Sequence, residues 1–244
     1  MYTGATIYYI LNFFHLTVNI RNICVLTAPI FSAFTALATY LLTSDSSDST
    51  SAGLVAAALV AIVPGYISRS VAGSFDNEGI AIFALIFTFW LWVRSVKTGS
   101  IFWGTLCSLA YFYMVTAWGG YIFIINLIPL HVVVLLVTGY FSSRVYVAYN
   151  TFYVVGTILA MHVRFVGFQA VQSSEHLAAF GTFGLLQLYT FIQYLKGMLS
   201  PDMFKRVTRM FLIVGGVILL AGFIVGQITG VLAPFTGRFY SFLD

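Results

Sequence analysis

The sequence predicts an all-α polytopic membrane protein with about eight transmembrane helices joined by short loops. Of its 244 residues, 60% are hydrophobic and only 7% are charged, and the mean hydropathy is +0.97. A soluble domain contains roughly 45–50% apolar and about 25% charged residues, so this chain could not cover its apolar surface in water. In lipid, a helix of about 20 apolar residues crosses the hydrocarbon core and satisfies its own backbone groups. We therefore expect residues 1–244 to form a single transmembrane bundle.

The elements follow from where apolar stretches are bounded by polar or turn residues. The first stretch, 2–16, is short and rich in tyrosine, so we expect it to lie along the membrane interface. The predicted spans are 21–42, 52–67, 79–96, 101–118, 121–139, 146–163, 176–195 and 209–231.

Short segments of distinct composition separate or interrupt these spans. The polar stretch TSDSSDSTS at 43–51 is interpreted as a solvated linker and nothing more. Pro64 is expected to kink the chain near the end of its span. At 118–120, Trp-Gly-Gly leaves almost no loop between two spans, and such a sharp reversal requires glycine.

The basic residues indicate the orientation of the spans. If the loop at 68–78 lies outside, seven basic residues become cytoplasmic: Arg94, Lys97, Arg144, Lys196, Lys205, Arg206 and Arg209. Four do not: Arg21, Arg69, Arg164 and Arg238. The net charge of +4 is not gathered on one face, and the cluster at 196–209 is interpreted as a topology signal, so we expect no nucleic-acid partner.

The segment SRSVAGSFDNEG, at 68–79, concentrates charge in a chain that has little of it. It contains Arg69, Asp76 and Glu78. On a helix the two acids would lie about 200° apart and could not share a ligand, whereas in an extended backbone they point to the same side. The third span is expected to start after them, at about Gly79.

Two interpretations of this segment remain open from the residues alone. In the first, Asp76 caps a helix, Glu78 lies in its first turn, and each stabilises it by about 0.3–1 kcal/mol. Arg69 then extends to water or pairs with the acids. In the second, Asp76 and Glu78 hold Mg²⁺ or Mn²⁺, which prefer carboxylate oxygens, and Arg69 binds substrate phosphates.

Three separated stretches resemble the catalytic subunit of eukaryotic oligosaccharyltransferase, the enzyme of asparagine-linked glycosylation. They are GYISRSVAGSFDNEGIAIF at 65–83, YFYMVTAWGGYIFIINLIPLHV at 111–132 and TGRFYS at 236–241. The resemblance runs the length of the chain and implies transfer of an oligosaccharide from dolichyl pyrophosphate to asparagine in Asn-x-Ser/Thr acceptors. It implies that Asp76 and Glu78 are ligands of Mn²⁺ or Mg²⁺ in a lumenal loop and that Arg69 is catalytic, organising the pyrophosphate.

The resemblance also implies a location and partners. The expected location is the endoplasmic reticulum membrane, as a multi-pass protein with its active loops in the lumen. The expected partners are the dolichyl-pyrophosphate-linked oligosaccharide, an acceptor polypeptide, other oligosaccharyltransferase subunits and the lipid bilayer.

Several parts of the family's machinery are expected outside this sequence. These are a further metal-binding aspartate in the first lumenal loop, an acceptor-contacting glutamate in a later loop, and a C-terminal lumenal domain with a Trp-Trp-Asp motif. The chain is therefore interpreted as an internal fragment that is inactive alone. Ser-Ser-Glu-His at 173–176 looks like the Ser-Glu-His of that later loop, but it precedes the seventh predicted span. The family has a second stretch of similar sequence at that earlier place, so Glu175 is not assigned the acceptor-contacting role.

Two other classes of function remain as alternatives. A polytopic transporter could use Arg69, Asp76 and Glu78 for ion coupling, since intramembrane charges often mark transport paths. Against this, the charges fall in a loop, and the chain shows no repeat of two similar halves. A purely structural membrane subunit is the second alternative, and it predicts no metal binding that depends on Asp76.

Overall fold

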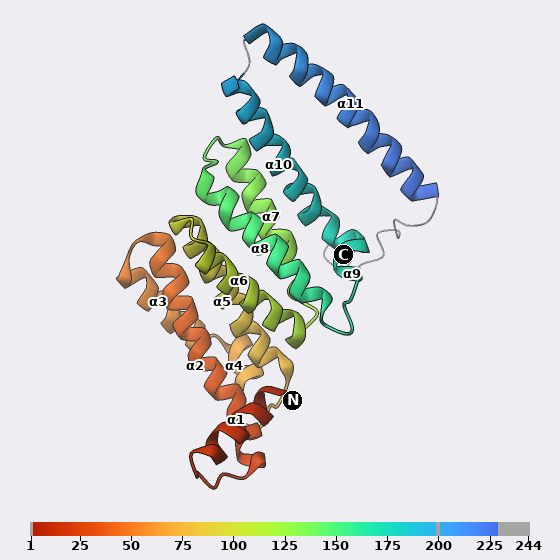
Figure 1. Ribbon diagram of the computed structural model, residues 1–244. Helices are drawn as coiled ribbons and strands as arrows, with labels where there is room; N and C mark the ends of the chain where they lie inside the picture. Colours follow the sequence, from red (N-terminus) through yellow and green to blue (C-terminus); the bar gives the residue numbers. More distant parts are fainter. Residues whose placement is uncertain (1, 199–200, 229–244) are drawn as a thin grey trace. The chain divides into compact units, whose positions relative to one another are not determined.

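The computed structural model describes residues 2–198 and 201–228, and every regular element in these two ranges is helical (Figure 1). The all-α prediction is thus confirmed for that part of the chain. The structure divides into two compact units, Met1–Ile124 and Ile125–Asp244, with the boundary inside one helix. Whether they form the single bundle predicted from the sequence stays a prediction.

The first unit is built around three long helices packed in series. Helix α2 packs against α3 and α5, and α5 packs against α6 (Figure 1). Small residues such as Ala81 and Ala84 are fully buried in α5, beside large ones such as Leu91. The helices are α1 (Tyr2–Phe13), α2 (Ile20–Ser47), α3 (Thr50–Ile62), α4 (Pro64–Ser70), α5 (Asn77–Thr98), α6 (Ile101–Ala117) and the start of α7 (Tyr121–Val137).

The second unit joins its helices through polar side chains. Tyr149 donates a hydrogen bond from its hydroxyl to Ala179 O over 2.8 Å, and Tyr146 donates to Gln187 Oε1 over 2.7 Å. Such bonds hold helices together where lipid supplies no hydrophobic drive. The elements are the rest of α7, α8 (Ser143–Met161), α9 (Gln169–Gln172), the 3₁₀ helix η1 (Ser174–His176), α10 (Leu177–Met198) and α11 (Pro201–Ile228).

Not all of the eight predicted spans are recovered as membrane-length apolar helices. Among the described residues, α2 and α5 are long and apolar enough to cross a membrane, and α3 with α4 would make a third span. Helices α6 and α7 are apolar but have only 17 residues each, at the short end of what a bilayer requires. The last predicted span, 209–231, ends outside the described residues.

The predicted span 52–67 is broken in the structure. Helix α3 ends at Ile62, and α4 starts at Pro64 with its axis turned by 61°. Proline has no N–H and fixes its own φ, so it is tolerated in a first turn but not inside a helix. The kink expected at Pro64 is confirmed, and it sends α4 toward the charged segment.

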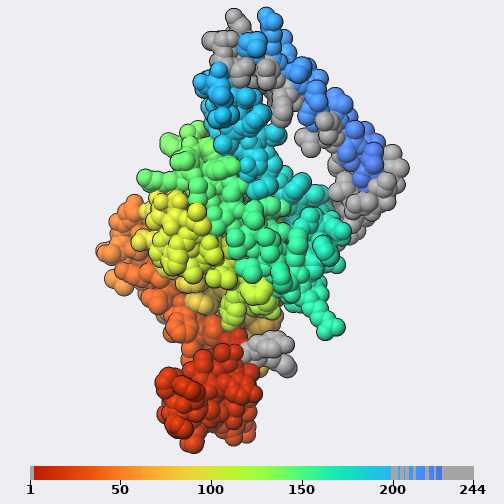
Figure 2. Space-filling model, viewed as in Figure 1, coloured from red at the N-terminus to blue at the C-terminus, as the bar shows by residue number. Residues whose placement is uncertain are grey.

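Helix α1 keeps its aromatic side chains on the surface. Tyr9, Phe13 and Phe14 are 72%, 79% and 67% exposed, and Figure 2 shows this first segment in red with its atoms at the surface of the first unit. Exposed tyrosine and phenylalanine suit the headgroup region of a bilayer. The interfacial location therefore stays a prediction that this exposure favours.

The interpretation of 43–51 as a solvated linker is wrong. Helix α2 continues to Ser47, and Asp45 accepts hydrogen bonds from Trp90 Nε1 over 2.8 Å and from Arg94 Nη1 over 3.2 Å. Lys97 donates to the backbone oxygen of Asp45 and forms an ion pair with Asp48 over 2.7 Å. The acids look solvated in the sequence because their partners lie some 50 residues later on α5. We call this group the Asp45 clamp.

Candidate functional site

The charged segment lies where α4 ends and α5 begins. Arg69 is in the last turn of α4, Asp76 precedes α5, and Glu78 is in its first turn. Helix α5 has 22 residues, about 33 Å at 1.5 Å per residue, and no charge lies between Glu78 and Arg94. The charges therefore sit at the two ends of a helix whose length matches a bilayer.

Asp76 is the N-cap of α5. Its backbone is extended, with φ −113° and ψ 157°, and its Oδ1 accepts a hydrogen bond from Asn77 N over 2.7 Å. The helix starts at Asn77, two residues earlier than the expected Gly79. Glu78 is consequently in the first helical turn, whereas Asp76 precedes the helix with an extended backbone. The two acids therefore do not share one extended stretch. The capping geometry is present, and Asp76 stays exposed beside it.

Arg69 and Glu78 are brought together by the fold. Arg69 Nε lies 3.0 Å from Glu78 Oε2, and the two side chains are 55% and 29% exposed. An ion pair this open to solvent stabilises a fold by about 0–1 kcal/mol. The pair therefore matters mainly for charge and orientation, because the guanidinium of Arg69 neutralises the carboxylate of Glu78 and holds it in place.

Three contacts fix the segment to the rest of the first unit. Gly73 N donates to Val25 O over 3.1 Å, which fastens the loop to α2. A Cβ at Gly79 would lie 3.4 Å from Arg69 O and 3.6 Å from Ala28 Cβ, so the helices approach closely there. Asn77 Nδ2 donates to Ala117 O over 3.0 Å. No local sequence pattern indicates this role of Asn77, because its partner lies 40 residues away.

The turn between α6 and α7 depends on Gly120 for space. A Cβ at Gly120 would lie 2.2 Å from the ring of Trp118, so the ring occupies the place of a side chain. Gly120 is not among the glycines with positive φ, so its role is close approach and not a left-handed backbone. The predicted need for glycine is confirmed at this position, for a different physical reason.

Replacing Gly120 by alanine in the full-length protein is expected to lower its stability by about 1–3 kcal/mol, the cost typical of overpacking. The Trp118 ring would have to leave its place. Thermal unfolding of the purified protein measures the change. Gly181→Ala is the matched control, because a Cβ at Gly181 meets nothing within 4 Å; equal unfolding temperatures for the two variants would contradict the prediction.

Two carboxylates suit a hard divalent cation, and this segment supplies two. Asp76 keeps its second oxygen exposed, since Oδ1 alone makes the capping bond. Over residues 2–198 and 201–228, no group of three or more His, Cys, Asp or Glu side chains is placed to hold a metal ion. Carboxylate oxygens are the donors that a hard cation prefers, so the residue types fit one. Because Asp76 is the N-cap and Glu78 is helical, the local backbone alone does not turn both acids toward one ligand.

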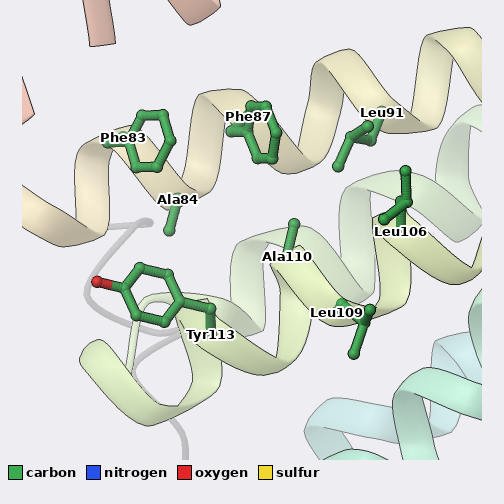
Figure 3. A pocket seen from close by; sticks show the side chains of 8 residues that line it. All are labelled: Phe83, Ala84, Phe87, Leu91, Leu106, Leu109, Ala110 and Tyr113. Atoms are coloured by element: carbon green, nitrogen blue, oxygen red, sulfur yellow. The ribbon is translucent and has the colours of Figure 1, made fainter. Parts of the chain in front are cut away.

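An apolar groove lies between α5 and α6, away from these charges. Its volume is about 280 Å³, and Figure 3 shows its lining of phenylalanine, leucine and alanine side chains, with the Tyr113 hydroxyl at one end. That hydroxyl forms a hydrogen bond of 3.0 Å with Thr3 Oγ1. The Tyr113 hydroxyl is the one titratable group among the lining residues, and Thr3 already engages it, so we place the site at the charged segment.

The segment at 173–176 forms a separate local structure in the second unit. His176 is buried, and its Nδ1 shares a hydrogen bond of 2.6 Å with Ser173 Oγ. Glu175 lies in the intervening 3₁₀ helix. The hydrogen bond closes the turn before α10.

Comparison with known proteins covers the whole chain. The family model described as "Oligosaccharyl transferase STT3, N-terminal" matches residues 1–244. A dolichyl-diphosphooligosaccharide–protein glycosyltransferase subunit STT3 from Dictyostelium discoideum is 57% identical over 100% of this chain and 34% of its own length. The corresponding subunit from Schizosaccharomyces pombe is 53% identical over 100% of this chain and 32% of its own length. The chain spans about a third of these relatives.

Solved structures support the fold at lower identity. The Archaeoglobus fulgidus oligosaccharyltransferase in complex with Zn and sulfate superposes with a TM-score of 0.64 at 18% identity, over 94% of this chain and 30% of that one. The same enzyme tethered to an acceptor peptide with an NVT sequon gives 0.60 at 17% identity, over 93% and 29%. Taken with the match over residues 1–244, these comparisons show that the chain belongs to the STT3 oligosaccharyl transferase family, in its N-terminal region.

Proposed function

We propose that this chain is part of the catalytic subunit of an oligosaccharyltransferase, which transfers an oligosaccharide from dolichyl pyrophosphate to asparagine in Asn-x-Ser/Thr acceptors. The observation that carries the proposal is the family match over residues 1–244. The charged segment agrees with it, because two acids and an arginine meet at one end of a membrane-length helix. That is the place where a lipid-linked donor and an acceptor from water could meet.

Asp76 and Glu78 would hold a divalent cation, Mn²⁺ or Mg²⁺, through carboxylate oxygens. Such a cation neutralises charge that develops on a departing pyrophosphate. The Archaeoglobus fulgidus oligosaccharyltransferase was solved in complex with Zn, so an enzyme of this fold has been observed with a divalent metal. Asp76 also caps α5, so in this proposal one side chain would serve both as a cap and as a metal ligand.

Arg69 would bind the phosphate oxygens of the donor. Its guanidinium is paired with Glu78 and 55% exposed, so it can reach a ligand from outside. If Glu78 held a cation, the Nε of Arg69 would lose its partner, and the whole guanidinium would be available to phosphate oxygens. In the absence of a charged ligand, the pair orients both groups.

The remaining predictions from the sequence belong to the same proposal. The chain would be a single eight-span bundle in the endoplasmic reticulum membrane, with the loop at 68–78 in the lumen. Its partners would be the lipid-linked oligosaccharide, an acceptor polypeptide, other oligosaccharyltransferase subunits and the bilayer. The chain would need segments outside residues 1–244 for activity.

The alternatives differ in what they predict for the charged segment. Membership of the STT3 family gives the transporter no support. A purely structural subunit predicts that a divalent cation is irrelevant to Arg69, Asp76 and Glu78. Metal removal therefore separates the catalytic proposal from the structural one.

Removing divalent cations is expected to lower transfer by the purified full-length protein in its complex at least about 100-fold, because the leaving group loses its counter-charge. The assay follows glycopeptide formed from a lipid-linked oligosaccharide and a labelled Asn-x-Thr peptide. Adding Mn²⁺ or Mg²⁺ after chelation should restore the rate, and a metal-saturated chelator is the control.

Residues 1–244 alone should form no glycopeptide in the same assay. A full-length rate unaffected by chelation would contradict the metal role, and glycopeptide from the isolated chain would contradict its incompleteness. No transfer by the full-length complex would overturn the proposed function itself.

A further inference from the structure

Asn77 links the two acids of the charged segment to a different helix. Its backbone N–H donates to Asp76 Oδ1 over 2.7 Å, and its side-chain Nδ2 donates to Ala117 O over 3.0 Å. It is the first residue of α5, directly before Glu78. One residue therefore connects the Asp76 carboxylate, the first turn of α5 and the end of α6.

The acceptor in this bond is the carbonyl of Ala117, at the end of α6. Ala117 is the last residue of α6, and the last carbonyls of a helix have no donor within it. Trp118 N donates to Met114 O over 3.0 Å just beyond it, and Met114 and Val115 are fully buried. The carbonyl is thus held by the core, and its partial negative charge favours an amide donor.

The residues before Asn77 are mostly exposed, from 71 to 76. Gly73 N donates to Val25 O on α2, and the Phe75 ring lies 3.4 Å from the position of a Cβ at Gly4 of α1. The first turn of a helix also lacks four of its own backbone bonds, so it frays easily. The Asn77 side chain restrains the point where the two acids are attached.

We propose that Asn77 is a positioning residue that fixes Asp76 and Glu78 against the end of α6 and thereby raises the affinity of the site for a divalent cation. This inference rests on the proposed function, since it assumes that the two acids bind the metal. Asn77 itself need not touch the cation. Loss of its side-chain bond lets the first turn of α5 fray, which separates the carboxylates more of the time.

The test compares Asn77→Gln with Asn77→Met in the full-length complex. Both side chains are one atom longer than asparagine, but only glutamine keeps an amide donor. For Asn77→Met, the Mn²⁺ concentration that gives half-maximal transfer should rise about three- to tenfold, the effect of one hydrogen bond. The maximal rate at saturating Mn²⁺ should change less than about twofold. For Asn77→Gln, the half-maximal concentration should stay within about twofold of the unmodified protein.

Controls separate this inference from the function on which it rests. Asn12→Met changes an exposed asparagine of α1 and should leave the Mn²⁺ dependence unchanged. Direct Mn²⁺ binding to the complex is measured in parallel, with Asp76→Asn as the variant that removes a proposed ligand. Binding that survives Asp76→Asn would defeat the proposed function.

Binding that is lost there, together with equal Mn²⁺ dependence for Asn77→Met and Asn77→Gln, would overturn only the role of Asn77. Should Asn77→Met fail to assemble, Asn77→Ala is compared with Asn77→Gln by the same criterion. A variant pair that differs in maximal rate but not in Mn²⁺ dependence also overturns the inference.

Discussion

Asp76→Asn in the full-length protein is expected to reduce oligosaccharide transfer at least about 100-fold while leaving the fold intact. Asparagine is as good an N-cap as aspartate, so the cap of α5 survives. It removes the negative charge, so the proposed cation loses a ligand. The measurements are the transfer rate at saturating Mn²⁺ and the unfolding temperature of the complex.

This substitution decides between the two interpretations that the sequence leaves open. If Asp76 serves only as a cap, Asp76→Asn retains near-normal transfer. Glu78→Gln applies the same logic to the second acid and should also lose transfer. Asp48→Asn is the control, because it neutralises an exposed acid whose side chain is 84% accessible at the other end of α5. Loss of transfer in Asp48→Asn equal to that in Asp76→Asn would show that charge alone, wherever it lies, accounts for the effect.

Arg69→Ala is expected to move two quantities in opposite directions. The maximal rate should fall at least about 100-fold, because the phosphate loses a positively charged partner. The Mn²⁺ concentration needed for half-maximal activity should fall a few-fold, because Glu78 no longer has a competing cation 3.0 Å away. Titrating Mn²⁺ in the transfer assay gives both values.

Two further variants sharpen this result. Arg69→Lys keeps the positive charge but not the planar fork of donors, so it should recover the Mn²⁺ dependence and only part of the rate. Arg164→Ala removes an exposed arginine of the second unit and should leave both quantities unchanged. A higher Mn²⁺ requirement in Arg69→Ala would mean that Arg69 supports the metal site and does not compete with the cation.

The sequence predicted well those features that are local to the chain. The apolar run after Asp76 and before the basic end at Lys97 gave α5 within two residues at each end. The kink at Pro64 followed from the chemistry of proline. The concentration of charge at 68–79 located the candidate site, because ionisable residues are costly in a membrane protein and often mark a functional site.

The features it could not predict are contacts between distant segments. Asn77 reaches Ala117 on α6, and Asp45 holds Arg94 on α5, whereas the pairing of Arg69 with an acid of its own segment was among the expectations. In the sequence alone, Asn77 and Asp45 look like ordinary solvated polar residues, because their partners lie 40 or more residues away. The linker at 43–51 was misjudged for this reason: its acids become structural only when α5 lies beside α2. Composition and periodicity specify which residues are apolar, but not which polar groups meet.

The Asp45 clamp determines how α5 can move. Sliding α5 along α2 would break the hydrogen bonds from Trp90 and Arg94 to Asp45 together with the Lys97 contacts. No ion pair joins α2 to the opposite end of α5 among the described residues; there the contact is the close approach of Gly79 to Ala28. Both ends of α5 are therefore anchored, but by different means: polar contacts to α2 at the Asp45 clamp, and the Asn77 hydrogen bond to Ala117 at the end that carries the acids.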